Sequence, residues 1–180
     1  MMIGVSMIHC QSTNSCGTCE QTISANNHNP AGVPLFAKVS DSLYRGAQPT
    51  EKGFVELKKM GIRTIVTLRV FDTDKNSLPD MNFRQFHISC KTLHPEEEDV
   101  IEFLRIVTDP ANQPVFVHCR EGIDRTGMMV AMYRMVIQDW PREKALAEMK
   151  AFGFHEIWNP LEDYIEKVDV AQLKSKLHEP

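Results

Sequence analysis

Apolar and polar residues alternate along most of the chain in patterns that predict strands and helices in turn. Short apolar runs of strand type occur at 43–45, 64–68, 83–88 and 114–117. Apolar residues recur at helical spacing over 50–60, 95–107, 126–138, 142–152 and 161–177. Strands that alternate with helices of this length are typical of an α/β protein. We therefore expect one α/β domain with a central, mostly parallel sheet flanked by helices.

The start of the chain lacks this pattern. Residues 9–34 are rich in Ser, Thr, Asn, Gly and Pro, a composition that buries little and stays solvated. We expect residues 1–33 to form a flexible polar tail and residues 34–180 to form the folded domain. The first basic residue is Lys38, so the start has no positively charged signal region. The sequence leaves both a cytoplasmic location and export of a longer precursor open.

The bulk composition excludes several classes of protein. The chain has 180 residues, of which 42% are hydrophobic and 24% charged, and no apolar run is long enough for a membrane span. Its formal net charge of −4 gives no overall attraction to nucleic acid. We expect a soluble monomer with neither a nucleic-acid partner nor a membrane span, in which any anion site is built locally.

The five cysteines are spread unevenly: Cys10, Cys16, Cys19, Cys90 and Cys119. An odd number without a paired framework argues against a disulfide scaffold. Cys16 and Cys19 form a C-x-x-C pair that could bind zinc or cycle between thiol and disulfide, although incidental thiols in a polar tail are the simpler interpretation. We expect Cys90 to be a small core residue rather than a redox partner of Cys119.

Candidate chemistry concentrates in the segment 117–127, with the sequence VHCREGIDRTG. It places Cys119 at the end of a buried strand and Arg125 six residues later, at the start of a helix. A loop this short must wrap, so its backbone N–H groups and the positive end of the helix form an anion cradle. The same field favours the thiolate of Cys119, which is a nucleophile. The planar fork of Arg125 can hold two phosphate oxygens.

A cysteine and an arginine at this spacing occur by chance roughly once in four such sequences. Requiring His118, Gly122, Thr126 and Gly127 as well lowers the chance expectation to about one in a million. The loop resembles the signature H-C-x-x-G-x-x-R-[ST]-G of the protein tyrosine phosphatase superfamily, which includes dual-specificity enzymes.

The flanking sequence extends this resemblance to small bacterial dual-specificity-type phosphatases. Tyr-Arg-Gly-Ala-Gln-Pro at 44–49 and Gly-Phe-His at 153–155 are similar to those enzymes, and the resemblance covers about residues 35–170. It implies a dual-specificity-like phosphatase fold and a two-step reaction. Cys119 takes the phosphoryl group while an acid protonates the departing oxygen, and water then attacks the phosphocysteine. No metal or other cofactor is implied.

The resemblance also implies roles for two neighbours of the nucleophile. His118 would fix the loop and bias the thiolate, and the Thr126 hydroxyl would donate a hydrogen bond to the sulfur and help it leave. The general acid is less clear, because the stretch 86–93, where many members carry an aspartate, contains no carboxylate.

Two sets of carboxylates are candidates for the missing acid. Asp124 lies directly before Arg125, as an aspartate does in myotubularins and Sac-type phosphoinositide phosphatases, and we expect it to be the acid; alternatively it forms only a salt bridge that holds the loop. The second set opens a predicted helix, where acids favour the positive helix end: Glu96, Glu97, Glu98 and Asp99.

The predicted substrate-binding residues lie in the loop or at the same edge of the sheet: Arg120, Glu121, Gly122, Ile123, Lys91 and His94, with Arg69 nearby. Positive charge at such a rim favours a compact polyanion. We therefore expect a phosphomonoesterase acting on inositol polyphosphates or phosphoinositides, with a protein tyrosine or dual-specificity phosphatase as the alternative. A silent phosphate-binding module and a rhodanese-like sulfurtransferase are further readings of the same loop.

Overall fold

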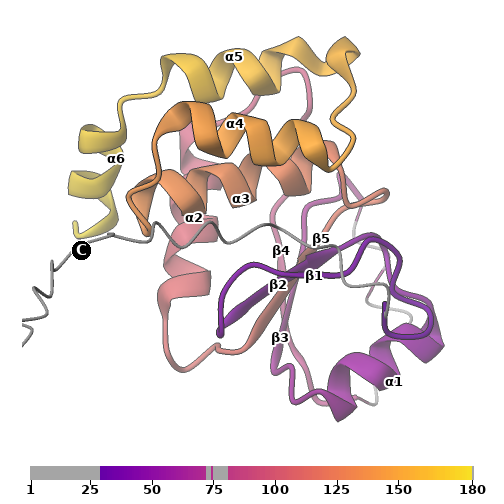
Figure 1. Ribbon diagram of the computed structural model, residues 1–180. Helices are drawn as coiled ribbons and strands as arrows, with labels where there is room; N and C mark the ends of the chain where they lie inside the picture. Colours follow the sequence, from indigo (N-terminus) through magenta and orange to yellow (C-terminus); the bar gives the residue numbers. More distant parts are fainter. Residues whose placement is uncertain (1–28, 72–73, 75–80, 180) are drawn as a thin grey trace, which may run out of the picture.

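The computed structural model, which describes residues 29–71, 74 and 81–179, has a five-stranded sheet between two layers of helix (Figure 1). The strands are β1 (Ala37–Lys38), β2 (Leu43–Gly46), β3 (Thr64–Thr67), β4 (Arg84–His87) and β5 (Val115–His118). Their order across the sheet is β1-β2-β5-β3-β4, and only β1 pairs in the antiparallel sense. The expected α/β fold with a mostly parallel sheet is confirmed.

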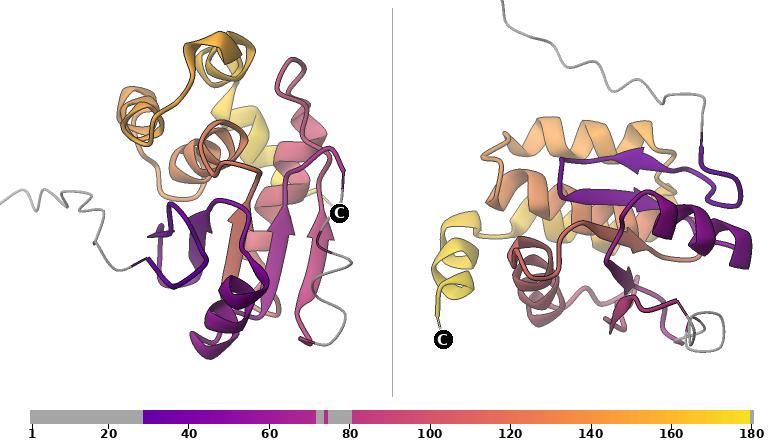
Figure 2. Two further views of the ribbon diagram at one scale, coloured as in Figure 1. Left: turned by 90° about the vertical axis from the view of Figure 1, so that its right-hand side faces the viewer. Right: turned by 90° about the horizontal axis from the view of Figure 1, so that it is seen from below.

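Helices cover both faces of this sheet. They are α1 (Glu51–Lys59), α2 (Glu97–Thr108), α3 (Asp124–Val136), α4 (Arg142–Ala151), the short 3₁₀ helix η2 (Glu156–Trp158), α5 (Asn159–Lys167) and α6 (Val170–Leu177). In β3, Ile65 packs into the cluster that contains residues of α1, whereas Val66 packs into the cluster with α2 to α6. Side chains alternate between faces in this way because the strand repeat is two residues. The two views of Figure 2 show α1 apart from the main helical layer.

The register places three chain segments together at one edge. β5 lies between β2 and β3, and His118 is level with Gly46 on one side and with Thr67 on the other. The four parallel strands therefore end at the same edge, which is where α/β sheets bind their ligands. The loop after β5 emerges at the centre of this edge.

The C-terminal helix predicted over 161–177 is in fact two helices. Val168 leaves the helical conformation, and the Asp169 side chain accepts a hydrogen bond from the Gln172 amide at 3.0 Å, which caps α6. Aspartate is a favoured cap because it satisfies an amide that lacks a helical partner. The sequence pattern missed this break because apolar residues continue through it.

Packing begins slightly before the predicted boundary at Pro34. Val33 is buried and belongs to the same cluster as Phe54 and Phe116. Most of the predicted tail, with Cys10, Cys16 and Cys19, lies outside the described residues. The short strand β1 was not predicted, since two residues carry no pattern.

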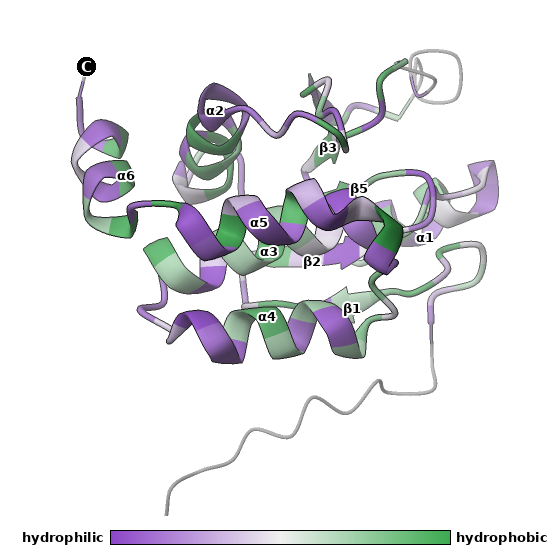
Figure 3. Ribbon diagram, turned by 90° about the horizontal axis from the view of Figure 1, so that it is seen from above, coloured by the Kyte–Doolittle hydropathy of each residue, from purple (hydrophilic) through white to green (hydrophobic). Residues whose placement is uncertain are grey.

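The outer helices are two-sided, with polar and apolar residues alternating along α4 and α5 in Figure 3. In α5 the apolar side is formed by Leu161 and Ile165, which are four residues apart and fully buried. Within the described part of the chain, no helix has the length and apolar character needed to cross a bilayer.

Candidate active site

The loop 119–125 is held from outside through its backbone carbonyls. The backbone N–H of Gln48 donates to the Arg120 carbonyl at 3.2 Å, and Arg45 Nη2 donates to the Gly122 carbonyl at 2.9 Å. In a trans peptide the C=O and N–H groups point in opposite directions. The amides that follow these carbonyls, those of Glu121 and Ile123, are therefore turned toward the inside of the loop.

The nucleophile candidate, Cys119, lies inside the loop, among these amides. Cys119 is 2% exposed, and its Sγ accepts a hydrogen bond from the Gly122 amide at 3.2 Å. Helix α3 starts at Asp124, and the apolar side chain of the preceding Ile123 cannot cap it. The first amides of α3 thus remain available for an anion.

At Gly122 the backbone of the loop contacts the backbone at the end of β2. Its φ is +74°, a region that L side chains rarely adopt, and a Cβ placed there would lie 2.5 Å from the Ala47 nitrogen and the Gly46 carbonyl carbon. A side chain at this position would push the loop away from the end of β2. The glycine of the signature is therefore required by the contact as well as by the turn.

His118 is fixed on both sides of its ring. Nε2 lies 2.8 Å from Oδ2 of Asp74, and Nδ1 lies 3.2 Å from the Cys119 carbonyl. Both partners can accept hydrogen bonds, so each ring nitrogen faces an acceptor. The pair is buried, and it fixes the ring next to the nucleophile.

Asp74 is a member of the site that the sequence did not single out. Burial would raise the pKa of its carboxyl, but hydrogen bonds from His118 and from Gln48 Nε2, the latter at 2.7 Å, outweigh burial and hold the pKa below its usual value. Gln48 also accepts a hydrogen bond from Arg69 Nη1 at 3.0 Å. In the sequence Asp74 is one of several aspartates in a loop, and nothing in the pattern distinguishes it from the others.

The remaining signature residues lie around the same edge. Arg125 Nη1 donates to the Leu68 carbonyl at 3.1 Å, which anchors its guanidinium at the end of β3. Thr126 is fully buried, and its Oγ1 has no hydrogen-bonding partner within the described ranges, so its bond to the Cys119 sulfur stays a prediction. Cys90 is buried as expected, and burial raises the pKa of its thiol to about 12.

Asp124 is engaged by the loop between α4 and α5. Its Oδ1 accepts a hydrogen bond from the His155 amide at 2.9 Å, and its Oδ2 lies 3.1 Å from His155 Nδ1. The hydrogen bond and charge of Asp124 raise the pKa of the exposed His155 ring, with a smaller contribution from Glu121. Ligand atoms of these three residues lie within 4.8 Å of one another, and the ion pair accounts for the closest of their contacts.

The second set of acid candidates lies on the first turn of α2. Partial burial and the charge of Glu96 raise the pKa of Asp99, against a smaller opposite effect of Lys91. Glu97 is paired with Lys176 of α6. After burial, the charge of Asp99 also raises the pKa of the Cys90 thiol, whereas that of Arg125 lowers it.

The predicted rim is mixed in charge rather than purely basic. Arg120, Glu121 and His94 are exposed. Lys91 is also exposed, and its Nζ lies 3.9 Å from Oε1 of Glu96. The rim therefore offers cations for a polyanion beside carboxylates that partly balance them.

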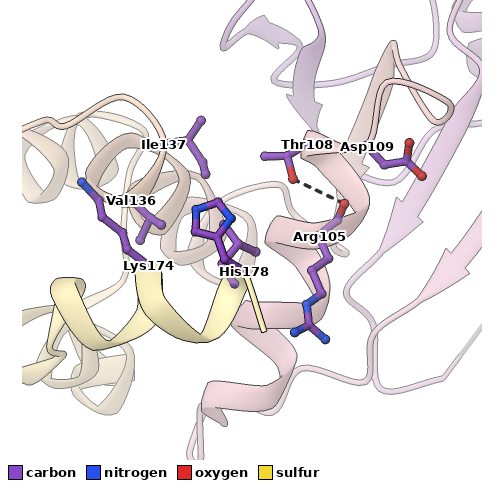
Figure 4. A pocket seen from close by; sticks show the side chains of 8 residues that line it. Arg105, Thr108, Asp109, Val136, Ile137, Lys174 and His178 are labelled. Atoms are coloured by element: carbon purple, nitrogen blue, oxygen red, sulfur yellow. Dashed lines mark hydrogen bonds between the residues drawn. The ribbon is translucent and has the colours of Figure 1, made fainter. Parts of the chain in front are cut away.

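A separate hollow of about 410 Å³ lies between the ends of α2 and α3 and the last helix, α6 (Figure 4). Lys174 and His178 border it from α6, and Arg105 and Thr108 from α2. It lies at the C-terminal end of α3, whereas the loop lies at the N-terminal end, roughly 20 Å away for a helix of this length. The hollow is therefore not part of the candidate active site.

The chain is similar in sequence and fold to known phosphatases. Residues 35–159 match the family model described as DSP-PTPase phosphatase fused to NAD+ kinase. The chain is 33% identical over 155 residues to the inositol diphosphatase DSP5 of Arabidopsis thaliana, covering 81% of this chain and 74% of that protein. It is 29% identical over 140 residues to the dual specificity protein phosphatase TpbA of Pseudomonas aeruginosa, covering 76% of this chain.

The chain spans 64% of the length of TpbA. A crystal structure of P. aeruginosa TpbA in complex with pTyr superimposes with a TM-score of 0.77 at 26% identity, covering 89% of this chain and 99% of the crystallised chain.

Proposed function

Since the chain belongs to the DSP-PTPase family whose model matches residues 35–159, we propose that it is a cysteine-dependent phosphatase that works through a phosphocysteine intermediate. The observation that carries this proposal is the loop itself. Cys119 lies at its base under the Gly122 amide, and the outward carbonyls turn other amides inward. Such a site binds a tetrahedral anion directly above a thiolate.

In the first step the Cys119 thiolate attacks phosphorus, an S–P bond forms and the bond to the leaving oxygen breaks. The inward amides and Arg125 hold the three remaining phosphate oxygens and stabilise the charge that spreads over them in the transition state. The anchored guanidinium needs little reorganisation for this role.

The leaving oxygen takes a proton, and we propose that Asp124 delivers it. The carboxylate lies in the loop, next to Arg125, and shares hydrogen bonds with His155. The hydrogen bond and charge of Asp124 raise the pKa of His155, so the imidazolium holds the proton and passes it through Asp124 to the leaving oxygen. Asp99, whose pKa is also raised, is the second candidate.

In the second step water attacks the phosphocysteine, the S–P bond breaks and the thiolate of Cys119 returns. The water gives up a proton to the Asp124–His155 pair, which lost one in the first step. The buried hydroxyl of Thr126 has a donor to spare, and a hydrogen bond from it to the departing sulfur would stabilise the thiolate.

We propose that the substrate is an inositol polyphosphate, including inositols that carry a diphosphate group, with phosphotyrosine peptides as the alternative. The similarity to an inositol diphosphatase and the exposed basic residues Arg120 and Lys91 at the predicted rim, with the exposed His94, support the first. The absence of a carboxylate from residues 86–93 fits cleavage of a diphosphate group, because the departing phosphate leaves without strong acid catalysis. The similarity to TpbA, which was crystallised with pTyr, supports the alternative.

The proposed function is tested with the nucleophile variant Cys119→Ser and the matched variant Cys90→Ser. We expect Cys119→Ser to lose turnover of p-nitrophenyl phosphate and of an inositol polyphosphate while it retains phosphate binding, because the amides and Arg125 remain. Cys90→Ser should retain turnover. Activity of Cys119→Ser above background would remove Cys119 as the nucleophile.

The same assay separates the other interpretations of the loop. A silent phosphate-binding module would bind phosphate but hydrolyse neither ester. A rhodanese-like sulfurtransferase would act on thiosulfate instead. We expect hydrolysis of phosphate esters and no transfer from thiosulfate.

A further inference from the structure

Arg45, the third residue of β2, is buried beneath the loop and is 1% exposed. Removing a guanidinium from water is costly unless hydrogen bonds and counter-charges compensate for it. Arg45 Nη2 donates to the Gly122 carbonyl, but Nε and Nη1 have no hydrogen-bonding partner within the part of the chain that the structure describes. Packing alone therefore does not explain why an arginine is buried here.

A second buried arginine in the same core provides a comparison. Arg134 forms a bidentate ion pair with Glu148, at 2.8 and 2.7 Å, and also donates to the Val39 carbonyl and to Gln138. Its hydrogen bonds lie within the scaffold and none reaches the loop. Arg134 is a structural arginine, whereas the hydrogen bond of Arg45 goes to the loop.

The surroundings keep Arg45 charged. Its guanidinium lies 3.8 Å from the centre of the Phe152 ring, a geometry that stabilises cations. Burial lowers the pKa of Arg45 to about 10, while the charges of Glu148 and Cys119 act in the opposite direction. At neutral pH the side chain is therefore a fixed cation.

We propose that Arg45 is a positioning residue of the catalytic loop: it holds the Gly122 carbonyl beneath the loop, turns the Ile123 amide toward the bound phosphate and places a fixed positive charge under Cys119. This inference rests on the proposed function. Gly122 connects the two effects, because its carbonyl is bound by Arg45 and its amide donates to the Cys119 sulfur.

The test replaces Arg45 by methionine, which fills similar space without charge. Iodoacetamide labelling of Cys119 is followed against pH, and the labelled peptide is read by mass spectrometry, so that labelling of the other cysteines does not interfere. We expect the midpoint of labelling to rise by about one pH unit, because a nearby cation no longer favours the thiolate. We also expect inhibition by orthovanadate to weaken by about tenfold, because an inward amide is lost.

Arg45→Lys and Arg134→Lys form a matched pair that separates positioning from folding. Arg45→Lys keeps the charge but loses the planar fork, so orthovanadate inhibition should weaken several-fold while the labelling midpoint moves much less than in Arg45→Met. Arg134→Lys should lower the melting temperature and leave both the midpoint and the inhibition unchanged.

A folded Arg45→Met protein with the wild-type midpoint and wild-type inhibition would overturn the proposal and make Arg45 purely structural. If Arg45→Met does not fold, Arg45→Lys decides, and wild-type inhibition of that variant would overturn the proposal. If the proposed function is wrong, the result is different: the wild-type protein hydrolyses no phosphate ester. Labelling of Cys119 still reports in that case whether Arg45 acts on the thiol.

Discussion

The buried carboxylate of Asp74 lies 2.8 Å from Nε2 of His118, the residue directly before the proposed nucleophile. We predict that Asp74→Asn lowers the free energy of unfolding by about 2 kcal/mol, the usual effect of losing a buried hydrogen bond to a charged group. Activity should fall as well, because His118 no longer holds the Cys119 carbonyl firmly. Urea denaturation and initial rates measure the two effects. Asp163→Asn, in an exposed ion pair with Lys167, is the control and should change neither.

The stability that the Asp74–His118 contact contributes depends on pH in a defined way. The pKa of Asp74 is lowered in the folded protein, so its contribution to stability is present above the unfolded value of 3.8 and is lost as the pH falls through the folded value. The difference in melting temperature between wild type and Asp74→Asn should therefore be constant from neutral pH down to about pH 4 and shrink below it. A difference that grew on acidification would contradict the assignment.

A pair of glycine substitutions tests the contact between the loop and β2. Gly122 and Gly61 both have positive φ, but a Cβ at Gly61 would meet nothing within 4 Å. Gly61→Ala should cost about 1 kcal/mol of stability and leave activity unchanged. Gly122→Ala should lose at least as much stability because of its positive φ. It should also lower kcat/KM at least about 100-fold, because displaced amides no longer bind the phosphate. Equal activities of the two variants would show that the contact has no bearing on catalysis.

The source of the proton is tested by comparing leaving groups. Asp124→Asn should slow hydrolysis of an alkyl ester such as glycerol 2-phosphate about 100-fold, but that of p-nitrophenyl phosphate only slightly, because nitrophenolate departs without a proton. Asp99→Asn serves as the parallel variant and should affect both esters alike. A selective loss in Asp99→Asn instead would transfer the role of the acid to Asp99.

The Asp124–His155 pair predicts a second pH effect, opposite in sign to that of Asp74. The pKa of His155 is raised in the folded protein above its ordinary value of 6.5. Its stabilising contribution is therefore present below pH 6.5 and is lost as the pH rises through the folded value. The destabilisation caused by His155→Asn should be larger in mildly acidic than in alkaline buffer. His178→Asn, at the distant hollow, should show no such trend.

Salt dependence distinguishes the two proposed substrates. For inositol hexakisphosphate, KM should rise roughly tenfold between about 50 and about 300 mM salt, because screening weakens capture of a polyanion. KM for p-nitrophenyl phosphate should change little. Arg120→Gln should reduce the salt dependence for the inositol substrate. A higher kcat/KM for phosphotyrosine peptides at physiological salt would favour the alternative substrate.

The parts of the site that could be predicted from the sequence are those built from neighbours in the chain. The strand at 115–118, the loop and the helix after it follow from one continuous motif, so Cys119, Arg125 and their setting at a strand end were predictable. His155 entered the sequence analysis only through the Gly-Phe-His match at 153–155, and the structure places it on Asp124. Its partner could not be named in advance, because the two residues are 31 positions apart.

Asp74 and Arg45 could not be predicted as members of the site, for different physical reasons. Asp74 lies in a polar loop, where an aspartate is usually solvated, and its importance comes from its contact with His118, 44 positions away at the end of β5. Arg45 lies within a short strand, where a charged residue normally points to water. Only the folded chain shows that this side chain is buried under the loop, with Phe152 against its guanidinium.

The way in which the loop is held also bears on how its specificity can be redesigned. In the proposed site, backbone amides bind the anion, and hydrogen bonds from Arg45 and from the backbone N–H of Gln48 orient these amides. The side chains of Arg120 and Glu121, by contrast, are exposed to solvent. Glu121 also contributes to the raised pKa of His155, so a change there would act on the proposed proton source. Arg120 is therefore the position to randomise in a library that seeks new substrates for an unchanged catalytic centre.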